Sequence, residues 1–176
     1  MNSPSDTPEI VPAEQFSDLV DSYQRSGHHV SLVTAAPPQS LDALALALGC
    51  NVADLYKTVC LNYKEDGGRR VLVSVVVPAA ARVDAAKVSS ALGVPAQKLK
   101  SAQPDFIAQE TGFVPGGIPP FGYEGRRLVD QSIFNRQVAY AGGGNNLHAY
   151  SRFAPAFLVF AHPDAIVGDF QQVQGI

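Results

Sequence analysis

A glycine- and proline-rich stretch, TGFVPGGIPPFGYEG at residues 111–125, most constrains how this chain can fold. Within it, residues 112–122 hold four glycines and three prolines, too irregular for a helix or strand and too apolar for a solvated linker. Glycine permits unusual backbone angles and the close approach of a ligand, whereas proline fixes φ. The stretch therefore predicts a shaped loop. It is either a packed connection or a binding loop whose N–H groups at Gly116, Gly117 and Ile118 meet an anionic or carbonyl oxygen.

Length and composition indicate an ordinary globular protein. The 176 residues suit one domain, 46% of them are hydrophobic, and no apolar run reaches the roughly 18 residues of a membrane span. The first residues lack the basic and apolar segments of a targeting peptide, so we expect a cytoplasmic protein without a membrane partner. A net charge of −3 disfavours coating of nucleic acid but permits contact with one end of an RNA. Cys50 and Cys60 lack zinc-site spacing and are expected to be buried thiols.

Helical spacing and strand-like segments alternate along the chain. Residues 1–11, rich in Ser, Pro and Asp, predict a flexible tail, and residues 12–176 predict a single domain. We expect helices at 12–26, 41–48, 85–92 and 104–110, strands at 29–35, 56–63, 70–77, 127–130, 137–141, 147–150 and 165–170, and either structure at 154–160. The near-continuous apolar run of 70–77 predicts a central strand. The fold class is therefore α/β or α+β, around a mixed and strongly curved sheet.

The sequence lacks the common catalytic and metal-binding motifs. It has no GxSxG nucleophile elbow, no phosphate-cradling loop and no histidine pair with metal-ligand spacing on a helix, so no metal site is predicted. His148 follows a glycine turn and either lines a pocket or is structural, and Asp130 is expected to cap a turn. Lys57 begins a predicted strand, where its amine either lies in water or neutralises a ligand oxygen. Together with loop amides that stabilise an oxyanion, this lysine indicates a hydrolase acting on an ester.

Three motifs occur in a fixed order: VADLYKT at 52–58, TGFVPGGIPPFG at 111–122 and AGGGNN at 141–146. Their combination resembles the YbaK/EbsC family of aminoacyl-tRNA deacylases, relatives of the editing domain inserted in bacterial prolyl-tRNA synthetases. The similarity runs from about His28 to the C-terminus. It implies a barrel-like mixed sheet flanked by helices, and trans-editing, the hydrolysis of an amino acid wrongly attached to a tRNA. It implies no metal and no organic cofactor.

The resemblance also implies roles for individual residues. Lys57 matches the family's essential lysine and would contact the phosphate or hydroxyl region of the terminal adenosine. Residues 116–120 match its GxxxP loop, whose amides would hold the aminoacyl carbonyl while a water, aided by the free ribose hydroxyl, attacks the ester. The predicted catalytic residues are Lys57, Gly116, Gly117 and Ile118, and the predicted substrate-binding residues are Pro119, Pro120, Phe121, Tyr140, Gly142 and His148.

The glycine turn departs from the pattern of many relatives, which carry a serine before it and an acid after it. Here Tyr140 and Leu147–His148 occupy those places, so the walls of the amino-acid pocket differ. A small residue such as Ala or Cys on tRNA(Pro) is the expected substrate. Because a pocket discriminates weakly between side chains that differ by one methylene, cognate prolyl esters must be rejected by shape or by lost positioning. The expected partner is the acceptor end of the tRNA, with an aminoacyl-tRNA synthetase as a further candidate.

Two alternatives to a deacylase use the same residues. A non-catalytic module would bind an aminoacyl or nucleotide end, or partner a synthetase, and would retain acceptor-stem RNA without hydrolysis. A Schiff-base enzyme would use Lys57 as a nucleophile, and borohydride would trap a carbonyl ligand on it. The presence of both the lysine and the whole glycine–proline loop favours the deacylase.

Overall fold

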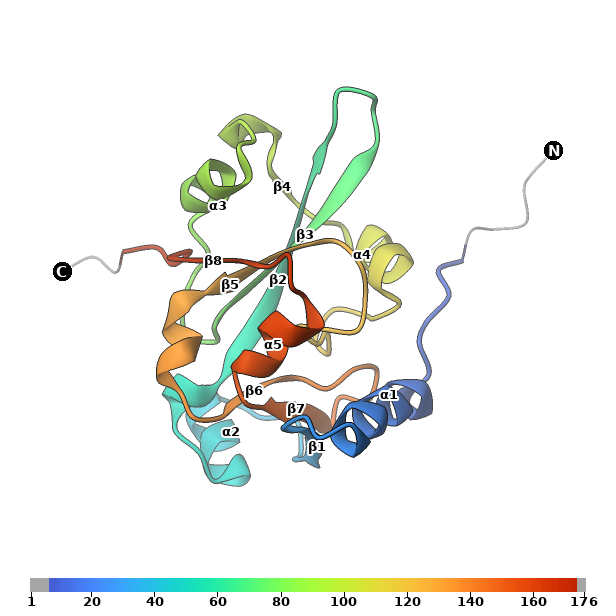
Figure 1. Cartoon of the computed structure of the whole chain (residues 1–176), viewed down its shortest axis with the longest axis vertical. Coiled ribbons are helices and arrows are strands. Elements are labelled where there is room, and N and C mark those ends of the chain that lie inside the picture. Colours follow the sequence, from blue (N-terminus) through green and yellow to red (C-terminus); the bar gives the residue numbers. More distant parts are fainter. Residues whose placement is uncertain (1–6, 174–176) are drawn as a thin grey trace.

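The computed structural model describes residues 7–173 and arranges them as two β-sheets with helices around them (Figure 1). The larger sheet has the strand order β4-β2-β3-β5-β8, and the smaller sheet has the order β1-β7-β6. The strands are β1 (Val30–Thr34), β2 (Tyr56–Lys64), β3 (Arg70–Pro78), β4 (Lys100–Ser101), β5 (Arg126–Asp130), β6 (Ala139–Gly142), β7 (Ala149–Phe153) and β8 (Ile166–Gly168). The α-helices are α1 (Ala13–Arg25), α2 (Leu41–Leu48), α3 (Ala85–Leu92), α4 (Pro104–Thr111) and α5 (Ala156–Ala161).

The larger sheet is mixed, as the sequence predicts. β2 and β3 form an antiparallel hairpin, whereas β3 with β5 and β5 with β8 run parallel. β3 is the middle strand, and its residues 71–77 are all buried, which confirms the prediction from its continuous apolar run. A mixed α/β fold is confirmed, but a strongly curved, barrel-like sheet is not. Among the described residues neither sheet closes into a barrel, because β6 and β7 pair with β1 instead of joining the larger sheet. The two sheets are connected by an isolated bridge between Leu55 and Tyr140.

N-cap hydrogen bonds and C-terminal glycines define the ends of α2 and α3. The Ser40 hydroxyl accepts a hydrogen bond from the Ala43 N–H at 3.1 Å, and Gly49 ends α2 with a φ of +71°. Asp84 caps α3 in the same way, so the predicted ranges of both helices are confirmed. Residues 154–160, which suited either structure, contribute α5, and β8 is shorter than the predicted last strand. Within residues 7–173, none of the helices has the length and apolar character needed to cross a membrane.

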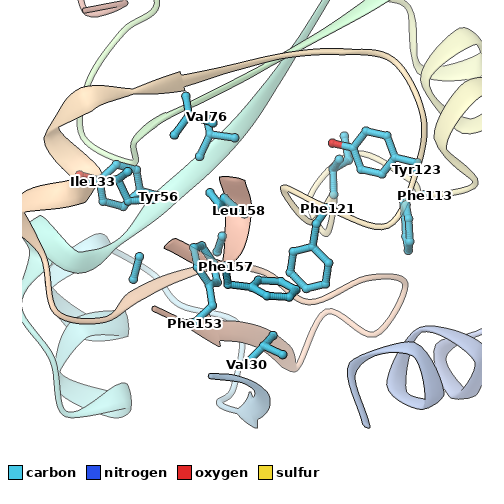
Figure 2. Close-up of a cluster of buried hydrophobic side chains, with 14 of the residues drawn as sticks. Val30, Tyr56, Val76, Phe113, Phe121, Tyr123, Ile133, Phe153, Phe157 and Leu158 are labelled. Carbon is cyan, nitrogen blue, oxygen red and sulfur yellow. The ribbon is translucent and has the colours of Figure 1, made fainter. Parts of the chain in front are cut away.

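An aromatic core fills the space between the two sheets. Phe121 from the glycine–proline loop is fully buried there, with its ring centroid 5.0 Å from that of Phe157 and 5.4 Å from that of Phe16 (Figure 2). A second apolar cluster covers the opposite face of the larger sheet and includes Val75 and Val88. Burial of apolar side chains on both faces stabilises the larger sheet.

The segment just before α1 contacts the glycine–proline loop through Val11. Val11, the last residue of the predicted tail, donates its N–H to the Gly112 carbonyl at 2.8 Å. Its own carbonyl accepts a hydrogen bond from the Asn145 side chain at 2.7 Å. Residues 1–6 of the predicted tail lie outside the described residues. The chain from Val11 onward therefore takes part in holding the loop and the glycine turn together.

A buried carboxylate should be a main determinant of stability. Asp130 is 1% exposed, and its side chain accepts hydrogen bonds from the Ser132 N–H at 3.1 Å, the Phe170 N–H at 2.9 Å and the Gln171 side chain at 2.9 Å. Asp130→Ala would leave these donors unpaired, so we expect urea denaturation to show a free energy of unfolding lower by about 3 kcal/mol. Asp18→Ala, on the exposed face of α1, is the control and should change it by less than about 0.5 kcal/mol. Equal effects of the two substitutions would contradict this account.

Candidate active site

A cavity of about 260 Å³ lies where the start of β2, the glycine–proline loop, β6 and α2 meet. It is lined by Leu41, Leu44, Leu55, Tyr56, Lys57, Thr58, Ala79, Gly116, Ile118, Tyr140, Ala141, Gly142 and Tyr150. We call it the Lys57 cavity. The β2–β3 hairpin extends away from α2 and β6, so the tip of the hairpin lies far from this site (Figure 1).

The structure brings several predicted site residues together in this cavity and places others elsewhere. Lys57, Gly116, Ile118, Tyr140 and Gly142 line it. Gly117, Pro119 and Pro120 are buried and do not line it, and Phe121 belongs to the aromatic core because its ring packs between α1 and α5. His148 is exposed, and its carbonyl accepts a hydrogen bond from Ala35 next to β1. Neither Phe121 nor His148 lines the cavity, so the structure gives no support for their predicted contact with the substrate.

Lys57 places a positive charge in the cavity. It is the second residue of β2, lies opposite Val77 on β3 and is partly buried. Burial lowers the pKa of its ammonium below the usual value, and the nearby positive charge of Arg82 adds to this shift. Within residues 7–173, Lys57 forms no ion pair. A desolvated ammonium without a carboxylate partner can bind an anionic or hydroxyl oxygen of a ligand.

The glycine–proline loop offers backbone donors at the same cavity. Gly116 adopts a φ of +104°, which favours glycine, and both Gly116 and Ile118 line the cavity. Among the described residues, the N–H groups of Gly116 and Ile118 have no hydrogen-bond acceptor. The Gly117 N–H, also predicted to meet the ligand, instead donates to the Val114 carbonyl at 3.3 Å. Two of the three predicted amides are therefore free to bind a carbonyl oxygen.

The loop is held against the glycine turn by contact between backbones. The Gly144 N–H donates to the Gly117 carbonyl at 2.8 Å. A Cβ atom on Gly117 would overlap the Gly144 carbonyl oxygen, and one on Gly142 would overlap the Ile118 carbonyl oxygen. The Asn145 side chain completes the contact by accepting from the Val114 N–H at 3.0 Å. The second and third sequence motifs thus form one rigid wall of the cavity.

The remaining lining residues, apart from Thr58, are apolar or aromatic. The Tyr140 hydroxyl accepts a hydrogen bond from the Arg152 side chain at 3.1 Å, which fixes the ring. Burial raises the pKa of the Tyr150 hydroxyl, so it stays a neutral group that can donate a hydrogen bond. The Thr58 hydroxyl oxygen is buried without a hydrogen-bond partner among the described residues. Sequence reasoning missed Tyr150, Thr58 and the α2 leucines, although the spacing of Leu41 and Leu44 on one helix face was a usable signal.

The cavity can bind and polarise a carbonyl group, but its lining supplies no conventional base. The lining includes no Asp, Glu, His, Cys or Ser. Across residues 7–173, no cluster of three or more His, Cys, Asp or Glu residues could hold a metal ion. The groups present are one ammonium, two free backbone N–H groups and several hydroxyls. Such a set stabilises developing negative charge on an oxygen.

Comparison with protein families agrees with these motifs. The model of the aminoacyl-tRNA editing domain matches residues 36–151, which include Lys57, the glycine–proline loop and the glycine turn. The chain therefore belongs to the aminoacyl-tRNA editing domain family, and the predicted YbaK-like family is confirmed.

Solved structures share the fold. A crystal structure of a candidate trans-editing enzyme for prolyl-tRNA synthetase matches with a TM-score of 0.75 at 23% identity, covering 93% of this chain and 99% of that one. The hypothetical protein APE2540 matches with a TM-score of 0.71 at 24% identity, covering 88% of this chain and 99% of that one. A scaffold structure from a study of epitope backbone grafting matches with a TM-score of 0.74 at 22% identity, covering 94% and 100%. At these identities the likeness establishes a common fold.

Gly117→Ala tests the backbone contact that shapes the cavity. The added methyl group must push the loop and the glycine turn apart, so we expect the free energy of unfolding to fall by about 1–3 kcal/mol. The amide NMR signals of Ile118 and Gly144 should shift at the same time. Gly67→Ala is the matched control, because no heavy atom lies within 4 Å of a Cβ built on this hairpin glycine. Wild-type stability and spectra in Gly117→Ala would refute the interlocked arrangement.

Proposed function

We propose that this protein is a trans-editing deacylase that hydrolyses the ester bond of a misacylated tRNA. Membership of the editing-domain family supports aminoacyl-tRNA deacylation as the class of activity. The observation that carries the proposal is that Lys57, Gly116 and Ile118 line one cavity and that the N–H groups of the two loop residues have no acceptor among the described residues. An ester carbonyl needs donors of this kind where its oxygen becomes negative.

In the proposed mechanism each group acts without forming a covalent bond to the substrate. The N–H groups of Gly116 and Ile118 hold the aminoacyl carbonyl and stabilise the oxyanion formed when water attacks the ester carbon. Lys57 binds the phosphate or hydroxyl region of the terminal adenosine and so positions the ester. The free ribose hydroxyl of the substrate assists the water, since the cavity lining contains no carboxylate or imidazole. The carbon–oxygen bond to the ribose then breaks, releasing the amino acid and the tRNA.

The cavity favours a small uncharged amino acid. Its volume is about 260 Å³, and apolar or aromatic residues such as Leu44, Leu55 and Tyr140 form much of its wall. No acidic residue lines it to pair with a basic substrate side chain. We therefore propose Ala or Cys on tRNA(Pro) as the substrate, recognised through the acceptor end and delivered free or from a synthetase. The matched candidate trans-editing enzyme for prolyl-tRNA synthetase supports this choice of tRNA.

A deacylation panel tests the proposal. The purified protein is incubated with Ala-, Cys-, Ser-, Thr- and Pro-tRNA(Pro), and release of the amino acid is followed for wild type and Lys57→Ala. We expect hydrolysis of Ala- or Cys-tRNA(Pro), with a rate reduced about 100-fold or more in the variant because a positioning charge is lost. Lys64→Ala, at the exposed far end of the same strand, should retain the wild-type rate.

Other outcomes would replace the proposal with one of the alternatives. Binding of acceptor-stem RNA without hydrolysis of any ester would indicate a non-catalytic binding module. Borohydride trapping of a carbonyl compound on Lys57 would indicate Schiff-base chemistry instead, which a lysine with a lowered pKa can perform. Normal turnover by folded Lys57→Ala would contradict the role given to this residue.

A further inference from the structure

Arg127 is a buried cation outside the Lys57 cavity. It is the second residue of β5, pairs with Ser74 of β3 and is 3% exposed. Within the described part of the chain no Asp or Glu forms an ion pair with it. Its Nε is buried without a hydrogen-bond acceptor. A buried charge that lacks a counter-ion is costly, because its lost hydration is not replaced.

The protein groups around this guanidinium are neutral. It lies 4.4 Å from the centre of the Tyr123 ring, and its terminal nitrogens reach the Tyr123 carbonyl only at 3.5 Å. One terminal nitrogen lies 2.8 Å from Nδ1 of His162. Burial and the positive charge of Arg127 lower the pKa of His162 to about 4, so the imidazole is uncharged at neutral pH. These contacts hold the guanidinium in place but do not balance its charge.

A surface depression of about 800 Å³ includes this arginine in its lining. It shares no lining residue with the Lys57 cavity. Leu19 and Tyr23 of α1 supply apolar and aromatic surface on one side. The other charged residues of its lining, Arg126, Glu124 and Asp164, are exposed. Water screens these three charges more effectively than the buried one.

We propose that Arg127 anchors the phosphate group of a ligand that occupies this depression. The planar fork of a guanidinium donates two parallel hydrogen bonds to a phosphate. One terminal nitrogen of Arg127 is taken by His162, but the Nε–H has no acceptor among the described residues and the other terminal nitrogen reaches the Tyr123 carbonyl only at 3.5 Å. The ring of Tyr23 can support an organic body attached to the phosphate. The site is separate from deacylation and is tested independently of it.

The first test is an NMR titration of the wild-type protein, which follows the arginine Nε–H signals. Three probes are added at constant ionic strength: inorganic phosphate, adenosine 5′-monophosphate and an acceptor-stem RNA hairpin without an amino acid. We expect a saturable shift of the Arg127 signal that sodium chloride does not cause. A shift with the RNA identifies the phosphate of an RNA chain, and a shift with the small probes alone identifies a phosphorylated small molecule. Absence of a saturable shift with all three probes would overturn the proposal.

A charge-conserving variant separates the guanidinium fork from simple attraction. Arg127→Lys keeps the positive charge but loses the two parallel donors, so the probe that shifts Arg127 should bind about tenfold more weakly or worse. Arg69→Lys is the matched control at the hairpin, where Arg69 pairs with Glu65, and should bind like wild type. Equal weakening in both variants, or none in Arg127→Lys, would refute the proposed site. If Arg127→Lys does not fold, the wild-type titration decides.

Discussion

The contact between two glycine backbones is the constraint on which the candidate site depends. The Gly144 N–H binds the Gly117 carbonyl, and a side chain on Gly117 would overlap the turn. This contact fixes the loop so that Ile118 lies at the cavity with its N–H unpaired among the described residues. The aromatic core holds the other end of the loop through Phe121. β2 begins at the same cavity, so its second residue, Lys57, also lines it. Segments that are far apart in sequence therefore form one site.

Much of the fold could be predicted because its signals are local. The Ser40 cap with Gly49, and the Asp84 cap of the next helix, define helix ends through hydrogen bonds and backbone angles that depend on a few neighbouring residues. The division into two sheets could not be predicted, since it depends on β7 pairing with β1 and β6 rather than joining the larger sheet. β4 is a two-residue strand at Lys100–Ser101 with no hydrophobic pattern to reveal it. The ambiguity at 154–160 had the same origin, because a short apolar run fits either structure.

Some residues of the candidate site can likewise be recognised from the local sequence, whereas the others are placed there by tertiary packing. The glycine–proline loop is recognisable from its composition, and Lys57 from its place in a set of motifs that resembles the editing family. The Phe121 ring lies in the core because helix packing decides which way a loop side chain points. Tyr150 reaches the cavity through the register of β7, where it lies opposite Gly142, and the sequence carries no signal for that pairing. Motifs therefore identify reactive groups, whereas the walls of the cavity require the fold.

An amide NMR titration with a non-hydrolysable substrate mimic, alanine joined through an amide to the amino group of 3′-amino-3′-deoxyadenosine, tests the carbonyl site directly. We expect downfield shifts of the Gly116 and Ile118 amide protons as they bind the carbonyl oxygen, with no comparable change at Gly117, whose N–H is already bonded to Val114. Binding of the mimic without any change at Gly116 and Ile118 would show that these amides do not bind the aminoacyl carbonyl.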